Sequence, residues 1–91
     1  METLYIVYGK DECKFCDAAT SLLDSQNLEY TLFKLGEHFS REDLLEKFPN
    51  AKTYPQIVKI TINVDSGTTR EEYIGGYDQL VENQKENYIV G

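Results

Sequence analysis

The stretch LYIVYGKDECKFCDAATSLL, residues 4–23, holds a predicted strand, a turn and the start of a predicted helix. Aromatic and β-branched residues fill positions 4–8, as is typical of a strand. From residue 13 to residue 25 the apolar side chains recur at helical spacing, and we expect them to form a buried face: Phe15, Ala19, Leu22 and Leu23. Both cysteines of the chain, Cys13 and Cys16, therefore lie where a strand ends and a helix begins.

Downstream, residues 28–35 alternate in polarity and predict a second strand. Ser40 is a predicted N-cap, and Asp43 at the third helical position completes an acidic form of the capping box. Proline at position 49 ends this second helix. We expect its buried side to hold three residues: Leu44, Leu45 and Phe48.

Residues 56–64 and 68–74 predict two further strands, because β-branched residues dominate the first and the turn signal Asp65-Ser66-Gly67 separates them. Gly75-Gly76 ends the fourth strand, and we expect Asp78 to cap a last helix that runs to about residue 85.

The predicted order is β-α-β-α-β-β-α, which is an α/β fold with a four-stranded mixed sheet and three flanking helices. The first two strands should be parallel and joined by a right-handed crossover, and the last two should form an antiparallel hairpin. No repeat, linker or low-complexity segment interrupts the sequence, so we expect residues 1–91 to form a single domain.

The composition narrows the class of protein. The net charge is −7, which argues against nucleic acid as a main partner because phosphate binding needs clustered Lys and Arg. The apolar run in residues 1–8 is too short to span a bilayer and lacks the features of a signal peptide, so we expect no membrane partner. We expect a cytoplasmic location, where stable structural disulfides are rare.

Two cysteines three residues apart suggest a metal site, a structural cross-link or a redox centre. A structural zinc site needs about four ligands, and beyond the two thiols the chain offers only His38, which we expect to be a solvated loop residue. We therefore expect no metal site. A Cys-x-x-Cys pair that follows a strand and opens a helix, within a β-α-β unit, is a strong redox signal.

The redox interpretation assigns a different role to each thiol. Cys13 lies at a helix start, where unpaired N–H groups favour the thiolate, and we expect it to be the nucleophile. Cys16 is one turn further along the same face, and we expect it to be more buried and to resolve mixed disulfides formed on Cys13. Nearby charges act in both directions: Lys10 and Lys14 favour the thiolate, and the carboxylates of Asp11, Glu12 and Asp17 oppose it.

Three motifs resemble those of the glutaredoxin family, and they occur in the family's order: Cys13-Lys14-Phe15-Cys16, Thr53-Tyr54-Pro55-Gln56 and Ile74-Gly75-Gly76-Tyr77-Asp78-Gln79-Leu80. The resemblance covers residues 4 to about 85 and looks most like the dithiol glutaredoxins of phages and bacteria. It implies a thioredoxin-like fold and an enzyme that uses glutathione as reducing co-substrate to reduce protein disulfides and glutathione mixed disulfides. It also implies protein clients such as ribonucleotide reductase, and we expect a monomer.

The resemblance further implies a glutathione site. A cis Pro55 would face the thiols and turn the backbone of Tyr54 outward, where it would pair with the cysteinyl part of glutathione. Gly76 and the following helix start would receive the γ-glutamyl carboxylate, and Asp78 the γ-glutamyl ammonium. The glycyl carboxylate would be held by Lys10 or Lys52, and aromatic contacts would come from Phe15 and Tyr77.

The sequence departs from the family pattern in three places. Lys14 follows the first cysteine where the family usually has proline, and Tyr54 precedes the predicted cis-proline where valine is common. The hairpin of residues 56–74 is longer than the family norm, which is either a tolerated extension or a partner contact.

Two other functions are compatible with the sequence. One is a glutaredoxin-like redoxin that is reduced by thioredoxin reductase and needs no glutathione groove. The other is a carrier of a [2Fe–2S] cluster held by Cys13 and glutathione, which the second thiol at Cys16 disfavours.

Overall fold

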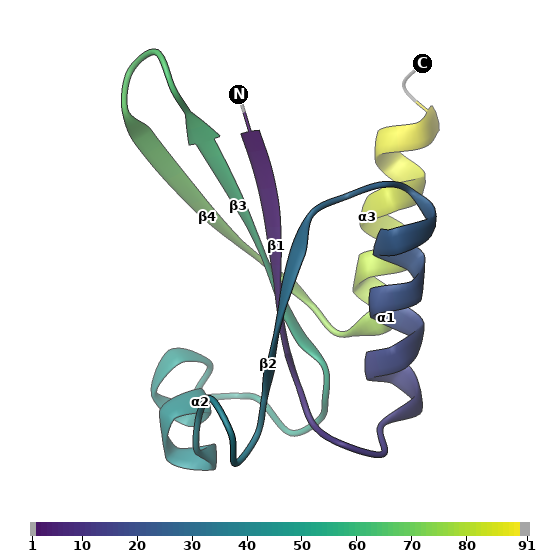
Figure 1. Cartoon of the computed structure of the whole chain (residues 1–91), viewed down its shortest axis with the longest axis vertical. Coiled ribbons are helices and arrows are strands. Elements are labelled where there is room, and N and C mark those ends of the chain that lie inside the picture. The colour runs from purple at the N-terminus through teal and green to yellow at the C-terminus, as the bar shows by residue number, and fades with distance from the viewer. Residues whose placement is uncertain (1, 90–91) are drawn as a thin grey trace.

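The computed structural model describes the backbone of residues 2–89 and the side chains of residues 2–85. Its seven elements follow the predicted order (Figure 1). They are β1 (Glu2–Gly9), α1 (Lys14–Ser25), β2 (Tyr30–Lys34), α2 (Arg41–Lys47), β3 (Gln56–Asn63), β4 (Thr68–Gly75) and α3 (Tyr77–Ile89).

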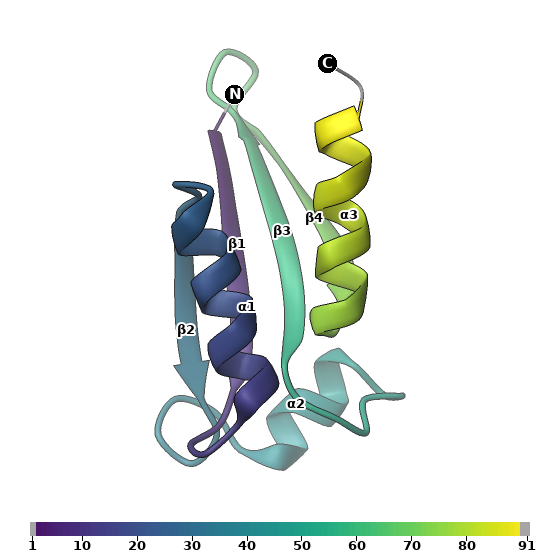
Figure 2. The ribbon, with the colours of Figure 1, turned by 90° about the vertical axis from the view of Figure 1, so that its right-hand side faces the viewer.

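The four strands form one mixed sheet in the order β2-β1-β3-β4. β1 pairs with β2 in parallel and with β3 antiparallel, and β3 pairs with β4 antiparallel, as the sequence predicts. Helices α1 and α3 cover one face of the sheet, and the short α2 lies on the opposite face near the end where β1 finishes (Figures 1 and 2). The α/β thioredoxin-like architecture is therefore confirmed.

The main core lies between the sheet and the helices α1 and α3. Six buried residues form its centre, and they come from four elements, β1, α1, β3 and α3: Tyr5, Val7, Ala19, Leu23, Ile57 and Leu80. The register explains why these strand residues meet, because Val7 is paired with Ile57 and their side chains point to the same face. The hydroxyl of the buried Tyr5 accepts a hydrogen bond of 3.0 Å from Nε2 of Gln84 on α3, so its polar group is satisfied.

A smaller aromatic cluster fills the opposite face beneath α2. The ring of Tyr8 on β1 lies 5.4 Å from Phe39 and 5.6 Å from Phe48, and Phe48 lies 5.0 Å from Tyr73 on β4. The predicted capping box at the start of α2 is confirmed, since Ser40 and Asp43 exchange both hydrogen bonds. Leu45 is exposed, contrary to expectation, because the two-turn helix turns only Leu44 toward the protein.

Several predicted boundaries shift. β2 begins at Tyr30 rather than at residue 28, and α3 continues to Ile89, past the predicted end near residue 85. The prediction that Asp78 caps α3 is wrong: the helix begins at Tyr77, so Asp78 is its second residue. The backbone of Gly76 takes the cap position, where its carbonyl accepts from Leu80 N and its own N–H donates to Oε1 of Gln79.

No helix within residues 2–89 is both long and apolar enough to cross a membrane.

Candidate active site

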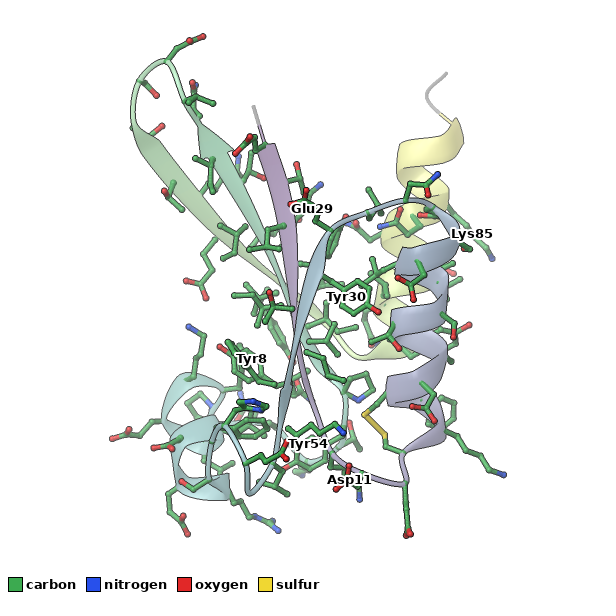
Figure 3. All side chains as sticks on the ribbon, in the orientation of Figure 1. Tyr8, Asp11, Glu29, Tyr30, Tyr54 and Lys85 are labelled. Carbon is green, nitrogen blue, oxygen red and sulfur yellow. A yellow bond between two sulfur atoms is a disulfide. The ribbon has the colours of Figure 1, made fainter. Side chains whose placement is uncertain are left out.

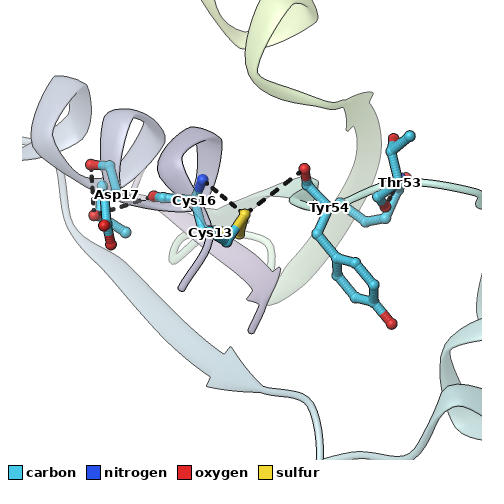
Figure 4. The surroundings of a disulfide bond; sticks show 7 residues. Cys13, Cys16, Asp17, Thr53 and Tyr54 are labelled. Atoms are coloured by element: carbon cyan, nitrogen blue, oxygen red, sulfur yellow. Dashed lines mark hydrogen bonds between the residues drawn. A yellow bond between two sulfur atoms is a disulfide. The ribbon is translucent and has the colours of Figure 1, made fainter. Parts of the chain in front are cut away.

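Cys13 is the N-cap of α1. Its backbone is extended, with φ −122° and ψ 106°, and its Sγ accepts a hydrogen bond from the backbone N–H of Cys16 at 3.2 Å (Figure 4). A sulfur atom thus takes the place of the side-chain oxygen that usually caps a helix. An N–H donor and the positive end of the helix dipole both stabilise negative charge on this sulfur, so the geometry favours the thiolate over the thiol.

Cys13 and Cys16 form a disulfide, with their Cα atoms 5.2 Å apart (Figures 3 and 4). As predicted, Cys16 is the more buried of the two, at 2% exposure against 8% for Cys13. Its sulfur rests against β1, where a Cβ added at Gly9 would lie only 3.0 Å from Sγ of Cys16. The absence of a side chain at Gly9 therefore makes room for the second thiol.

The loop that leads into β3 faces this disulfide. The Tyr54-Pro55 peptide bond is cis, which confirms the prediction for Pro55. The carbonyl oxygen of Tyr54 lies 3.9 Å from Sγ of Cys13, within reach of a hydrogen bond from the reduced thiol (Figure 4). Residues 41 positions apart in the chain are thus brought together at one end of the sheet.

An open cavity of about 300 Å³ lies beside the loop and the start of α3. It collects five of the residues predicted to hold glutathione, together with Thr53 and Gln79; the five are Phe15, Tyr54, Gly76, Tyr77 and Asp78. The backbone of Gly76 lies close to the loop, since a Cβ there would be 3.5 Å from the carbonyl oxygen of Pro55. The cavity therefore joins three segments that are distant in sequence.

Three predicted residues do not line this cavity. Pro55 is buried behind it. Lys10 is exposed, and its Nζ lies 5.6 Å from the centre of the Tyr54 ring, so it borders the site through a cation–π contact. Lys52 is exposed on the loop, with its side chain outside the cavity lining.

The expectation that Phe15 belongs to the buried face of α1 is wrong. Its side chain is 60% exposed, although Cys16 in the same turn of α1 is buried. The ring lies 6.1 Å from that of Tyr77 and forms an exposed wall of the cavity with it.

The charges around Cys13 are partly paired. Asp11, two residues before it, forms an ion pair of 3.2 Å with Lys34 on β2. The hydrogen bond from Lys34 to Asp11 raises the pKa of Lys34. The ion pair partly neutralises the negative charge of Asp11, which would otherwise disfavour a thiolate at Cys13.

Sequence reasoning missed Thr53 and Gln79 as cavity residues. Both belong to the quoted motifs, so their membership in those motifs was the available signal. Among the described residues, no group of three His, Cys, Asp or Glu side chains is arranged to hold a metal ion. His38 is exposed in its loop, as expected, and its Nδ1 accepts from the backbone N–H of Lys34 at 2.9 Å.

Comparison with known proteins agrees with this geometry. The family model described as Glutaredoxin matches residues 5–66. Glutaredoxin 1 from Francisella tularensis, crystallised with cacodylate, is similar with a TM-score of 0.69 and 17% identity, over 94% of this chain and 96% of that one. Reduced Escherichia coli glutaredoxin is similar with a TM-score of 0.61 and 25% identity, over 93% and 96% of the two chains.

The solution structure of a glutaredoxin from Brucella melitensis is also similar, with a TM-score of 0.63 and 23% identity, over 93% of this chain and 82% of that one. No curated protein sequence shows a significant match to the chain.

Proposed function

The chain belongs to the glutaredoxin family, and on that premise we propose that it is a glutathione-dependent thiol-disulfide oxidoreductase. It reduces protein disulfides and glutathione mixed disulfides. The observation that carries the proposal is the position of Cys13 Sγ, which caps α1, is bonded to Cys16 and lies 3.9 Å from the carbonyl oxygen of Tyr54, a residue that lines the cavity. Such an arrangement suits a nucleophilic thiolate next to a bound peptide.

The proposed chemistry with glutathione mixed disulfides uses Cys13 alone. Its thiolate attacks the glutathione sulfur, an S–S bond forms between Cys13 and glutathione, and the substrate leaves as a thiolate that takes a proton from solvent. A second glutathione, as its thiolate, then attacks the bound glutathione sulfur. This step releases glutathione disulfide and restores the Cys13 thiolate.

Protein disulfides require both thiols. Cys13 attacks one substrate sulfur and forms a mixed disulfide, while the other substrate sulfur leaves as a thiolate. Cys16 then attacks Sγ of Cys13, frees the substrate and forms the Cys13–Cys16 disulfide, which is the state present in the structure. Two molecules of glutathione reduce this disulfide and become glutathione disulfide.

We assign the parts of glutathione to the cavity as follows. The cysteinyl backbone pairs with the backbone of Tyr54, and Phe15 and Tyr77 enclose the ligand between them. The γ-glutamyl carboxylate meets the first turn of α3, where Gln79 already engages the Gly76 N–H, so the next backbone amides of that turn receive the charge. Asp78, exposed in that turn, holds the γ-glutamyl ammonium.

Lys10 is the better candidate for the glycyl carboxylate, because it already contacts the Tyr54 ring, and Lys52 is the second candidate. We further propose that residues 1–91 act as one catalytic domain, as a monomer in the cytoplasm, and that ribonucleotide reductase is among the protein clients.

The test is turnover of a glutathionylated small disulfide in the presence of glutathione and glutathione reductase. We expect the wild-type protein to be active, Cys13→Ser to be inactive, and Cys16→Ser to keep much of this activity while losing reduction of protein disulfides. Turnover with thioredoxin reductase but not with glutathione would refute the glutathione dependence. Equal behaviour of the two variants would refute the assigned roles.

A further inference from the structure

We propose that Gln56 and Tyr73 form a bridge that holds the backbone of Thr53 and Tyr54 in position, and that both are therefore positioning residues of the substrate site. The inference rests on the proposed function, because it names residues that shape the same glutathione-binding loop.

Gln56 is the inner part of this bridge. It is the first residue of β3, directly after Pro55, and only 3% of it is exposed. Its Nε2 donates a hydrogen bond of 2.8 Å to the carbonyl oxygen of Thr53, and its Oε1 accepts one from the hydroxyl of Tyr73. Both ends of a buried amide are thus satisfied, one by the loop and one by the neighbouring strand.

Tyr73 is the outer part. It lies on β4, and its ring stacks on Phe48 at the end of α2, with centroids 5.0 Å apart and an interplanar angle of 30°. Phe48 in turn packs against Tyr8. Tyr73 does not line the cavity that holds Thr53 and Tyr54, and the hydrogen bond from its hydroxyl to Gln56 connects it to the Thr53 carbonyl.

The loop end of the bridge lies where substrate binds in the proposed function. Thr53 and Tyr54 both line the cavity, and Figure 4 shows them in succession beside the cysteines. An extended ligand that pairs with this backbone needs its N–H and C=O groups in fixed directions. Since such pairing is made equally in the ground state and in the transition state, loosening the loop weakens binding without slowing the chemistry.

Three variants test the bridge. Tyr73→Phe removes the hydroxyl and keeps the stacking on Phe48. Gln56→Met keeps a side chain of similar length and removes both hydrogen bonds. The matched control is Tyr30→Phe, which also loses a side-chain hydrogen bond, the 3.1 Å contact to Asp24. Tyr30 lies on β2, well separated from Tyr54 (Figure 3).

The steady-state kinetics of glutathione mixed-disulfide reduction are the main measurement. We expect Tyr73→Phe to raise KM about fivefold, the effect of one lost hydrogen bond, with kcat changed by less than about twofold. Gln56→Met should raise KM further, and Tyr30→Phe should match the wild type. Because both residues act through one amide, the double variant Gln56→Met/Tyr73→Phe should be no worse than Gln56→Met alone. The pH dependence of kcat should be the same in all variants.

An unchanged KM in both single variants, additive effects in the double variant, or an equal KM rise in Tyr30→Phe would each overturn the bridge. If the wild-type protein does not reduce glutathione mixed disulfides, the proposed function fails, and NMR then decides on the bridge separately. Shifted amide resonances of Thr53 and Tyr54 in Tyr73→Phe, but not in Tyr30→Phe, would support it. Unshifted resonances would refute it.

Discussion

The two ends of the β3–β4 hairpin belong to the same pair of strands but are held by different interactions. At the end near the cysteines, Gln56, Ile57 and Val58 are buried, as is Gly75 at the end of β4. At the far end the residues are partly or fully exposed, and Val64 is 67% exposed. Figure 1 shows the far end extending beyond the helices.

The far end is shaped by local hydrogen bonds. Oδ1 of Asn63 accepts from the backbone N–H groups of Asp65 and Ser66, and the carbonyl of Asn63 accepts from Gly67 at 2.8 Å. The near end is shaped by contacts with β1, α1 and α3, and it is there that the loop of Tyr54 and the Gly75-Gly76 turn attach. Substitutions at the two ends should therefore differ both in stability and in activity.

The largest contrast is expected between two isoleucines of β3. Ile57 is fully buried in the main core, and Ile57→Ala should lower the free energy of unfolding by about 2–5 kcal/mol. Ile62 is partly exposed near the far end, and Ile62→Ala should lower the free energy of unfolding by only about 1 kcal/mol. Urea unfolding measures both values, and equal losses would contradict the difference in packing.

Two glycines with positive φ give the next contrast. Gly75 has φ 116°, and a Cβ there would lie 2.9 Å from Cγ of Gln79, whereas Gly67 has φ 70° and open space around it. Gly75→Ala should lower the free energy of unfolding by about 2–3 kcal/mol, because the backbone is strained and the Gln79 side chain is displaced. Gly67→Ala should cost about 1 kcal/mol.

The same two variants should also differ in activity, because only Gly75 lies at the end of the hairpin that adjoins the cavity. Gln79 lines the cavity and accepts from the N–H of Gly76, so Gly75→Ala should raise KM for glutathione mixed disulfides while Gly67→Ala leaves it unchanged. A higher KM in Gly67→Ala, measured on fully folded protein, would show that the far end takes part in binding.

A smaller effect is expected where Gly9 meets the second thiol. An added Cβ would lie 3.0 Å from Cys16 Sγ and 3.3 Å from Leu32 Cδ1, so Gly9→Ala should displace the sulfur of Cys16. Reduction of protein disulfides should slow several-fold, because Cys16 must reach Cys13 to release the substrate. In the Cys16→Ser background the added methyl group should leave mixed-disulfide turnover nearly unchanged, and a large further loss there would assign Gly9 another role.

The smallest effect is expected at the tip of the hairpin. Asn63→Ala removes the acceptor of two backbone N–H groups and should cost about 1 kcal/mol of stability. Turnover of mixed and protein disulfides should be unchanged. A selective loss with one protein client would instead identify the extended hairpin as a contact for that client.

Elements with strong local signals were predicted well. The β-branched run of residues 56–64, the capping box of Ser40 and Asp43, and the two cysteines at the start of α1 all match the structure within one or two residues. The start of α3 was misplaced because Asp78 is a good cap residue, yet the backbone of Gly76 took that position. Capping propensity says which residue types suit an N-cap, but it does not say which of several neighbouring residues takes that position.

The candidate site was predicted in its members but not in its arrangement. The predicted glutathione site included five residues that line the cavity, but it also included Lys52, whose side chain lies outside it. Helical spacing assigned Phe15 to the buried face, although its side chain is exposed and lines the cavity with Tyr77. The bridge from Thr53 through Gln56 to Tyr73 has no signature in spacing, since its outer residue is 17 positions away on another strand.

By itself the sequence determined the order of the elements, the pairing of a strand with a helix around two thiols, and the family. These features depend on periodicity, caps and turn residues, which act over a few neighbours in the chain. Only the tertiary structure decided that Tyr54 faces Cys13, that Gly9 makes room for Cys16, and which side chains enclose the cavity. Those outcomes follow from the close packing of distant segments, where a shift of a few tenths of an ångström changes the contacts, and no local pattern encodes distances of that size.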